Sequence, residues 1–393
     1  MKTTLKTFAM LLLLFAVVLV MRMRILQAVP AAAMPVSAPA SVSEPSAAPS
    51  STPEPTPKPT PEPTPEPTPS PEYFTISVIG DCTLTSHQKL SDVNWYSYAG
   101  RMQGDYSYPF SNTAAYFKED DFTIANLECT LSDTPLYSDR TFQFRAPTEY
   151  VNILIEGGVE FVTTANNHAM DFGQAGLDNT YAALETYGFT YGKEGQAQLY
   201  TTVSGLVLGI YCDYNGYQPQ ISKCTEAITQ LREQGAEYII CAFHWGEELK
   251  YRPNQYQIDL ARACIDAGAD LIYGSHSHCL QPIEEYNDGL ILYSMGNWSF
   301  GGNTSPADRD TAIVQVSVKR DPDGAVSTDS YSIIPCCISS SPVGSGNGAD
   351  NDYCPIPYLP DTEEYERAMS KITGTYQGPD GQANYDNWHA SWG

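Results

Sequence analysis

Hydrophobic and polar positions along residues 73–340 alternate between two kinds of run. Short runs rich in β-branched and aromatic residues predict buried strands, and longer stretches with apolar residues three and four positions apart predict helices. The expected strands are 74–80, 122–126, 159–165, 206–212, 238–243, 270–274 and 290–296. Helices are expected at 176–188, 222–235 and 255–268. Alternating strands and helices predict a layered α/β fold with its functional groups in loops at strand ends.

Two later segments, 311–320 and 325–335, alternate apolar and polar residues with period two. This pattern predicts either an antiparallel edge on the main sheet or a second sheet. The chain beyond residue 340 is rich in Gly, Asp, Asn and Tyr, and only 362–374 has helical character. We treat 341–393 as a C-terminal extension without an assigned function.

Residues 1–34 resemble an export signal. Lys2 and Lys6 precede the apolar run 8–21, and Arg22 and Arg24 follow it. The run is short for a membrane-spanning helix, and the small residues after it could form a cleavage site, whereas the arginines favour retention as an anchor. Both alternatives place the rest of the chain outside the cytoplasm, either anchored to the cell membrane as an extracellular domain or secreted.

Residues 35–72 are a linker rich in Pro, Thr and Glu. Such a composition cannot bury a core and is expected to be disordered and extended. The linker is either a spacer that holds the domain away from a membrane or a passive tether.

Charge limits the possible partners. The chain of 393 residues has a formal net charge of -25 and is 42% hydrophobic. A chain of this length buries a full core in one large or two smaller domains. The excess of acidic residues opposes nucleic-acid binding, which requires a basic face, and it also disfavours the attraction of anionic substrates.

Side chains able to bind metals follow five of the predicted strands. They are Asp81, Glu128, Asn167 with His168, His244, and His276 with His278. Each one alone could be an ordinary turn or helix-cap residue, but their gathering at one edge of a sheet favours a metal site. Imidazole, carboxylate and amide groups suit Zn, Fe or Mn, and two such ions can act together at phosphorus.

Four further residues are weaker candidates. Asp171 could orient His168 or cap the following helix, and Arg145 could contact an anionic substrate or simply lie at the surface. Glu248 follows the strand that ends near His244, and Asn297 follows the strand at 290–296, where it could merely close a turn.

Six blocks of sequence carry a resemblance. The blocks "GDCTL", "NLECTL", "TTANNHAMDFG", "FHWGEELKYRPNQYQIDLARACIDAG", "ADLIYGSHSHCLQPIE" and "YSMGNWSF" span roughly 74–300. They resemble the CapA/PgsA family of poly-γ-glutamate capsule synthesis, which is related to the calcineurin-like metallophosphoesterases. The resemblance implies a four-layer α/β/β/α sandwich over 73–340, in a membrane-anchored extracellular component of polyglutamate synthesis and export.

The resemblance also implies roles for the candidate residues. It places one divalent metal on Asp81 and His278, a second on Asn167, His244 and His276, a bridge at Glu128, and a catalytic acid at His168. The sequence departs from the metallophosphoesterase pattern at two positions, and the first of them reduces the ligands from the usual seven to six. Thr83 stands where a histidine is usual, and "NLE" supplies Glu128 where an aspartate is usual.

Two classes of function therefore remain open. One is a metal-dependent hydrolase of phosphoesters or of the polymer's own amide bonds. The other is a non-catalytic module that binds poly-γ-glutamate or the membrane subunits that synthesise and export it. The ten cysteines do not bear on this choice. Cys82, Cys129 and Cys279 each follow a candidate ligand, which predicts buried free thiols rather than a disulfide framework.

Overall fold

The computed structural model describes residues 70–87, 94–215, 221–341 and 351–379. The expected N-terminal segment 1–34 and nearly all of the expected linker 35–72 lie outside these ranges. Among the described residues, no helix combines the length and the apolar character needed to span a bilayer.

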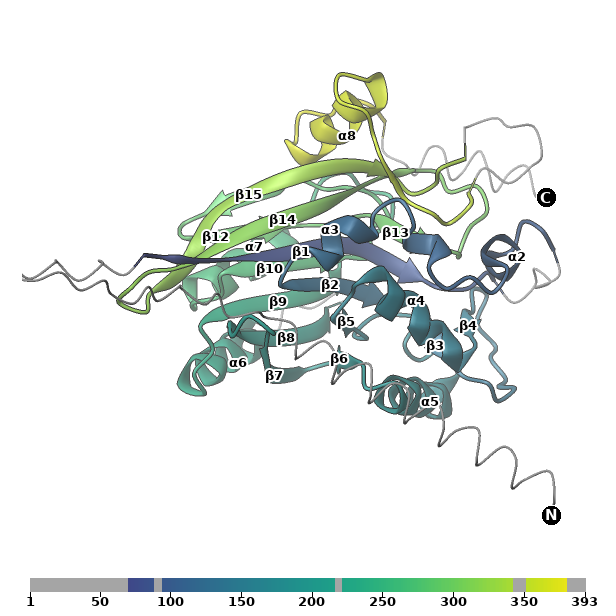
Figure 1. Ribbon diagram of the computed structural model, residues 1–393, viewed down its shortest axis with the longest axis horizontal. Coiled ribbons are helices and arrows are strands. Elements are labelled where there is room, and N and C mark those ends of the chain that lie inside the picture. Colours follow the sequence, from purple (N-terminus) through teal and green to yellow (C-terminus); the bar gives the residue numbers. More distant parts are fainter. Residues whose placement is uncertain (1–69, 88–93, 216–220, 342–350, 380–393) are drawn as a thin grey trace, which may run out of the picture. The chain divides into compact units, whose positions relative to one another are not determined.

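The fold is built on two large β-sheets (Figure 1). The eight-stranded sheet has the order β16-β15-β14-β1-β2-β5-β6, with β13 beside β1. Its strands are β1 (Glu72–Thr83), β2 (Phe122–Leu127), β5 (Phe161–Thr163), β6 (Thr190–Gly192), β13 (Asn297–Phe300), β14 (Asp310–Arg320), β15 (Val326–Cys337) and β16 (Ile356–Pro357). The six-stranded sheet has the order β11-β12-β10-β9-β8-β7. Its strands are β7 (Gln196–Thr201), β8 (Val207–Asn215), β9 (Tyr238–Trp245), β10 (Leu271–Ser275), β11 (Ile283–Tyr286) and β12 (Gly289–Leu292).

The central strands of both sheets are parallel. β1, β2, β5 and β6 run in one direction, and β8, β9, β10 and β12 do so in the other sheet. β14 and β15 add to β1 as antiparallel strands, so the period-two segments form an edge of the first sheet. A short pair, β3 (Thr130–Leu131) with β4 (Arg145–Ala146), lies outside both sheets.

The two sheets pack face to face, with helices on both outer sides. Ile76 and Ile124 of the first sheet share one apolar core with Ile210 and Ile240 of the second. The outer face of the first sheet packs against α2 (Tyr98–Met102), η1 (Tyr108–Phe110), α3 (Ala114–Lys118), η2 (Thr148–Tyr150), α4 (Val151–Gly157) and α5 (Gly173–Thr186). The outer face of the second packs against α6 (Ile221–Glu233) and α7 (Gln255–Asp266). The expected four-layer α/β/β/α sandwich is confirmed.

The expected strand 290–296 is wrong in its extent, because the chain changes sheets within it. β12 ends at Leu292 in the second sheet, and β13 begins at Asn297 in the first. The crossing is tight: a Cβ atom on Gly80 would lie 2.1 Å from the carbonyl oxygen of Gly296, whose φ is 68°. Only glycines allow the two backbones to approach this closely.

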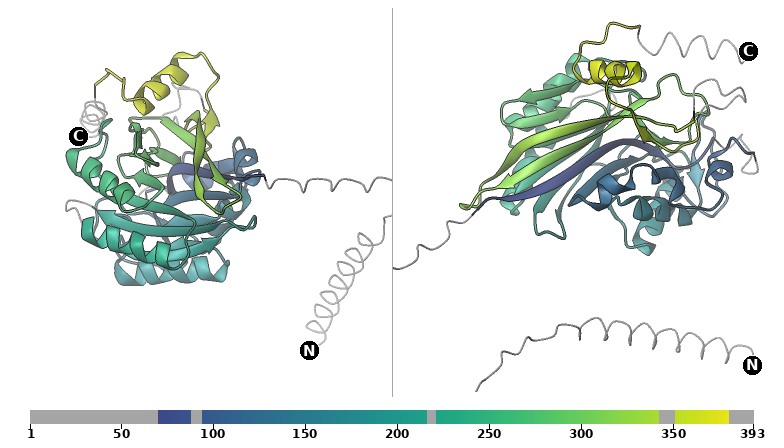
Figure 2. Two further views of the ribbon diagram at one scale, coloured as in Figure 1. Left: turned by 90° about the vertical axis from the view of Figure 1, so that its left-hand side faces the viewer. Right: turned by 45° about the horizontal axis from the view of Figure 1, so that its top comes forward.

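Among the described residues beyond 340, a strand and a helix pack against the same fold, so the expected boundary at 340 does not divide it. β16 pairs with β15, and α8 (Glu363–Ile372) packs against β14 and β15. Figure 2 shows α8, in yellow, beside these green strands. Ala368 and Ile372 enter the core between the sheets, which the helical pattern of 362–374 alone could not reveal.

All ten cysteines lie within the described ranges, and none forms a disulfide. Nine of them are buried, and Cys337 is partly exposed. The expectation of buried free thiols is confirmed for Cys82, Cys129 and Cys279, which follow candidate ligands along the chain.

Candidate metal centre

The candidate ligands meet where the carboxyl ends of strands from both sheets come together. Asp81 lies near the end of β1, Glu128 follows β2, and Asn167 follows β5. His244 lies near the end of β9, and His276 and His278 follow β10. Parallel neighbours end at one edge of a sheet, which is why residues far apart in sequence gather here. The first sheet thus supplies the carboxylates and the amide, and the second supplies the imidazoles.

These side chains form two groups of three metal-binding residues that share Glu128. One group is Glu128 with His244 and His276, and the other is Glu128 with Asp81 and His278. Within each group the donor atoms lie within 4.8 Å of one another.

Individual distances agree with this arrangement. The Oε1 atom of Glu128 lies 3.4 Å from Nε2 of His244 and 4.0 Å from Nε2 of His278. Nδ1 of His278 lies 3.4 Å from Oδ2 of Asp81. Asn167 joins the first group, because its Oδ1 lies 2.8 Å from Nε2 of His244.

Several donor atoms of the centre are buried without a partner. Both carboxylate oxygens of Glu128 and Nδ1 of His276 have no hydrogen bond to any described residue. Leaving a buried polar group unsatisfied costs about 1–3 kcal/mol, and more when it is charged. These orphaned atoms are oxygen and nitrogen donors that converge on one place, so the residues fit a divalent metal.

Burial sets the protonation of the imidazoles. Burial lowers the pKa of His244 well below its usual range and lowers that of His276 to about 4. Burial alone would lower the pKa of His278, but Glu128 and Asp81 outweigh it and raise the value to about 10. Burial and the neighbouring Asp81 charge raise the pKa of Glu128. His244 and His276 are therefore held neutral, the form in which imidazole binds metals.

The loop after β10 adopts unusual backbone angles. His276 has a φ of 97° and His278 a φ of 54°, both in a region that residues other than glycine rarely enter. The backbone amide of His276 donates to Oδ2 of Asp81 at 3.3 Å. This strained loop directs both rings toward the carboxylates.

Three polar residues that the sequence analysis did not single out support the ligands. Asn126 donates to Oδ1 of Asp81 at 2.8 Å, and Asn166 donates to Oδ1 of Asn126 at 3.0 Å. The hydroxyl of Ser275 lies 2.9 Å from Nδ1 of His244. The one signal for Asn126 in the sequence is an amide within the apolar run 122–127.

His168 stands outside both groups and pairs with Asp171. Its Nδ1 lies 2.9 Å from Oδ2 of Asp171, and its ring meets Phe144 edge to face at 4.8 Å between centroids. Asp171 does not cap α5, because Phe172 occupies the N-cap position. Asp171 therefore orients the ring of His168.

The weaker candidates are placed as follows. Oδ1 of Asn297 lies 2.9 Å from Nδ1 of His278, whereas Glu248 is exposed beside the centre. Arg145 donates to two loop carbonyls, of Ser132 and Thr134, and is not among the residues lining the adjacent cavity.

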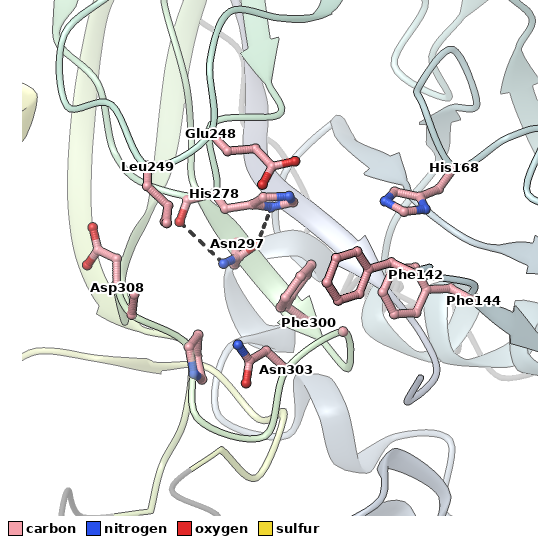
Figure 3. Close-up of a pocket in the computed structure, with 13 residues that line it drawn as sticks. Phe142, Phe144, His168, Glu248, Leu249, His278, Asn297, Phe300, Asn303 and Asp308 are labelled. Carbon is pink, nitrogen blue, oxygen red and sulfur yellow. Dashed lines mark hydrogen bonds between the residues drawn. The ribbon is translucent and has the colours of Figure 1, made fainter. Parts of the chain in front are cut away.

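A cavity of about 120 Å³ opens beside the centre (Figure 3). His168 and His278 line it together with Phe142, Phe144 and Phe300. The centre is therefore accessible next to an aromatic surface.

The fold and site define a class of protein: an α/β/β/α sandwich with a candidate metal centre where the strand ends of its two sheets meet. The chain belongs to the bacterial capsule synthesis protein PGA_cap family, whose model matches residues 75–301, more than half of the chain. The resemblance to the CapA/PgsA family is thereby confirmed.

Curated relatives include two capsule proteins. The PGA biosynthesis protein CapA of Bacillus subtilis (strain 168) is 29% identical over 237 residues, which cover 55% of this chain and 62% of that protein. The capsule biosynthesis protein CapA of Bacillus anthracis is 28% identical over 280 residues, covering 63% and 64%. The chain thus spans less than two thirds of the length of these relatives.

Similar solved structures include two nucleotidases. The NAD nucleotidase of Haemophilus influenzae has 13% identity and a TM-score of 0.40, with coverage of 82% of this chain and 68% of that chain. The 5'-nucleotidase of Candida albicans SC5314 has 12% identity and a TM-score of 0.39, with coverage of 67% and 50%.

Proposed function

We propose that this protein is a metal-dependent hydrolase acting on phosphoesters in the synthesis of poly-γ-glutamate. The relatives named for capsule and PGA biosynthesis support the pathway. The observation that carries the chemistry is the pair of three-residue groups that share Glu128, whose two oxygens are buried and have no partner among the described residues.

Two divalent ions, drawn from Mn, Fe and Zn, would occupy these groups. Asp81 and His278 would hold one, His244, His276 and Asn167 would hold the other, and Glu128 would contact both. When bound, such ions polarise a phosphoryl oxygen, lower the pKa of water and neutralise developing charge.

His168 would serve as the general acid. Asp171 fixes the ring through Nδ1, so Nε2 is left to donate a proton to the leaving oxygen. The His168 side chain is 13% exposed and borders the cavity, where a leaving group can reach it.

We further propose that the domain works outside the cell, held at the membrane by the apolar run 8–21 and spaced from it by the linker 35–72. Its partners would be poly-γ-glutamate or the membrane subunits that synthesise and export the polymer. The net charge of -25 argues against a nucleic-acid partner.

A second candidate is a non-catalytic module that binds the polymer or a partner protein on the same fold. Thr83 favours it: its hydroxyl is buried and has no hydrogen bond within the part of the chain that the structure describes. A threonine there supplies no imidazole ligand, so one ion would be held by fewer groups.

Metal content and hydrolysis together test the proposal. Elemental analysis of the purified protein should find about two ions per chain, and a His276→Ala, His278→Ala double variant should lose them. His168→Ala should retain the metals and lose phosphoesterase activity by roughly 10²–10⁴-fold. Met170→Ala, an exposed neighbour, is the matched control. A metal-free wild-type protein that still binds γ-glutamate oligomers would favour the binding module instead.

A further inference from the structure

Three phenylalanine rings are among the residues that line the cavity beside the centre. Phe142, Phe144 and Phe300 form its walls, and Leu249 and Pro306 add further apolar surface. Figure 3 shows the three phenyl rings gathered near His168 and His278, with Asp308 on the side away from His168.

The rings are held in place by their neighbours. His87 meets Phe142 and Phe144 edge to face, with centroids 6.0 and 6.1 Å apart, and its Nε2 lies 2.9 Å from the carbonyl oxygen of Thr141. The ring of Phe300 lies 5.0 Å from that of His278. The three phenyl rings and the rings of His168 and His278 therefore form one aromatic surface.

Apart from the two histidines of the site, the residues lining the cavity offer no positive charge to a polyanion. None of the described residues that line it is Lys or Arg, and two of them, Glu248 and Asp308, are acidic. Both oxygens of Asp308 accept from Nζ of Lys371 at 2.8 Å, so that lysine is already engaged. The nearby Arg140 donates to the carbonyl oxygen of Asn167 rather than lining the cavity.

The volume suits a single ring. An enclosed, dry apolar cavity of roughly 150 Å³ holds benzene. This cavity measures about 120 Å³ and is open, so it would cover part of a single ring rather than enclose it. Because His168 contacts Phe144 and both residues line the cavity, a leaving oxygen at His168 would have its substituent next to the phenyl rings.

Building on the proposed phosphoesterase function, we propose that the cavity binds an uncharged, ring-bearing leaving group, so that the substrate is the phosphate ester of an apolar cyclic alcohol rather than the γ-glutamate chain. Hydrolysis breaks the bond between phosphorus and the leaving oxygen and forms a bond from phosphorus to the oxygen of water. His168 gives its proton to the leaving oxygen, and water returns one. The products are phosphate and the alcohol.

The first test compares two esters whose leaving alcohols have similar acidity. The full-length, metal-loaded protein should hydrolyse benzyl phosphate with a kcat/KM roughly tenfold or more above that for glycerol 3-phosphate, since ring contacts are made only with the former. Phe142→Ala should reduce this ratio by roughly tenfold, and the 45% exposure of Phe142 means that the core stays intact. Tyr137→Ala, in the same loop, 87% exposed and outside the cavity, should leave the ratio unchanged.

The second test measures binding without turnover. Calorimetry should show benzylphosphonate binding more tightly than methylphosphonate or a γ-glutamate oligomer, and Phe142→Ala should remove the difference. Benzylphosphonate binding without any hydrolysis would support the ring site while overturning the proposed function. Hydrolysis with equal kcat/KM for both esters, or tighter binding of the γ-glutamate oligomer, would overturn the ring site and leave the metal-dependent chemistry standing.

Discussion

Glu128 bears on both the proposed metal binding and the stability of the fold. Its carboxylate is fully buried, belongs to both ligand groups, and has no hydrogen-bond partner among the described residues. Without a metal, burial and the Asp81 charge disfavour this carboxylate more than the nearby His278 favours it. The residue most important for binding is therefore expected to destabilise the metal-free fold.

The substitution Glu128→Gln tests this trade-off. We expect the variant to lose most bound metal, because the shared ligand is gone, yet in chelator to unfold at higher urea, by on the order of 1 kcal/mol, because a buried charge is removed. Elemental analysis and urea titration are the measurements. Glu248→Gln, also acidic but exposed, should change neither quantity. Full metal retention in Glu128→Gln would contradict the bridging role.

Glu160 provides a pH effect away from the centre. It accepts from the backbone amide of Thr123 at 2.7 Å, and burial raises its pKa to about 7. A carboxyl whose pKa is raised on folding stabilises the protein while protonated, below about pH 4.5, and that contribution is lost as the pH rises through about 7.

The free energy of unfolding should therefore fall between pH 4.5 and 7 by on the order of 1 kcal/mol from this residue, after allowance for solvent screening. Urea titrations across that range should show a flatter profile for Glu160→Gln than for the wild type. Glu156→Gln, an exposed neighbour, serves as control. If the free energy of unfolding falls equally with pH in Glu160→Gln and in the wild type, Glu160 is not the source of the pH dependence.

At the scale of elements, α8 is attached by a buried ionic cluster. Lys371 is 2% exposed and lies 2.8 Å from both oxygens of Asp308 and 2.7 Å from Oδ2 of Asp310. Arg367 adds two bonds to Asp310, at 2.7 and 2.8 Å. Asp308 also lines the cavity, so α8 contacts the cavity wall through this residue.

Lys371→Met should destabilise the protein by roughly 3–5 kcal/mol, since it leaves the buried Asp308 without its cation and Asp310 with Arg367 alone. Urea unfolding gives the magnitude, and hydrogen exchange should show loss of protection in α8. Lys319→Met breaks the surface pair with Asp321, which solvent screens, and should have a far smaller effect. Comparable losses for the two variants would mean that the buried cluster contributes no more than a surface pair.

Sequence patterns predicted some of these elements and not others. Short buried strands ending in Asp81 and His244 were recognisable, because apolar runs and the polar residues after them are local signals. The ionic cluster of α8 was not recognisable from the sequence, because Lys371 and Asp308, which bond to each other in it, are 63 positions apart. Phe142 and Phe300 look like ordinary core aromatics in sequence, and the left-handed backbone of His276 has no local signature.

At the scale of the whole molecule, the centre joins the two sheets. Each ligand group combines a carboxylate of the first sheet with an imidazole of the second. An ion bound there would bind the folded protein alone and stabilise it by mass action.

Metal should therefore raise the melting temperature. At about a hundredfold excess over Kd, linkage predicts roughly 2.7 kcal/mol, or about 5 °C or more for a domain of this size. Calorimetric scans with Mn²⁺ and with chelator measure the shift. His276→Gly, which accepts the φ of 97° without strain and removes one ligand, should shrink the shift. An unchanged shift in that variant would place the stabilising ion elsewhere.

Because the candidate ligands come from both sheets, their positions also determine the order of folding and metal binding. Glu128 and His244 are 116 positions apart, so neither group exists before the sheets have packed. An ion bound at the proposed centre would then be taken up after folding, and it would be the one available where folding is completed. Refolding in Mn²⁺ alone, Zn²⁺ alone, or both would show whether supply or intrinsic affinity decides which metal the protein carries.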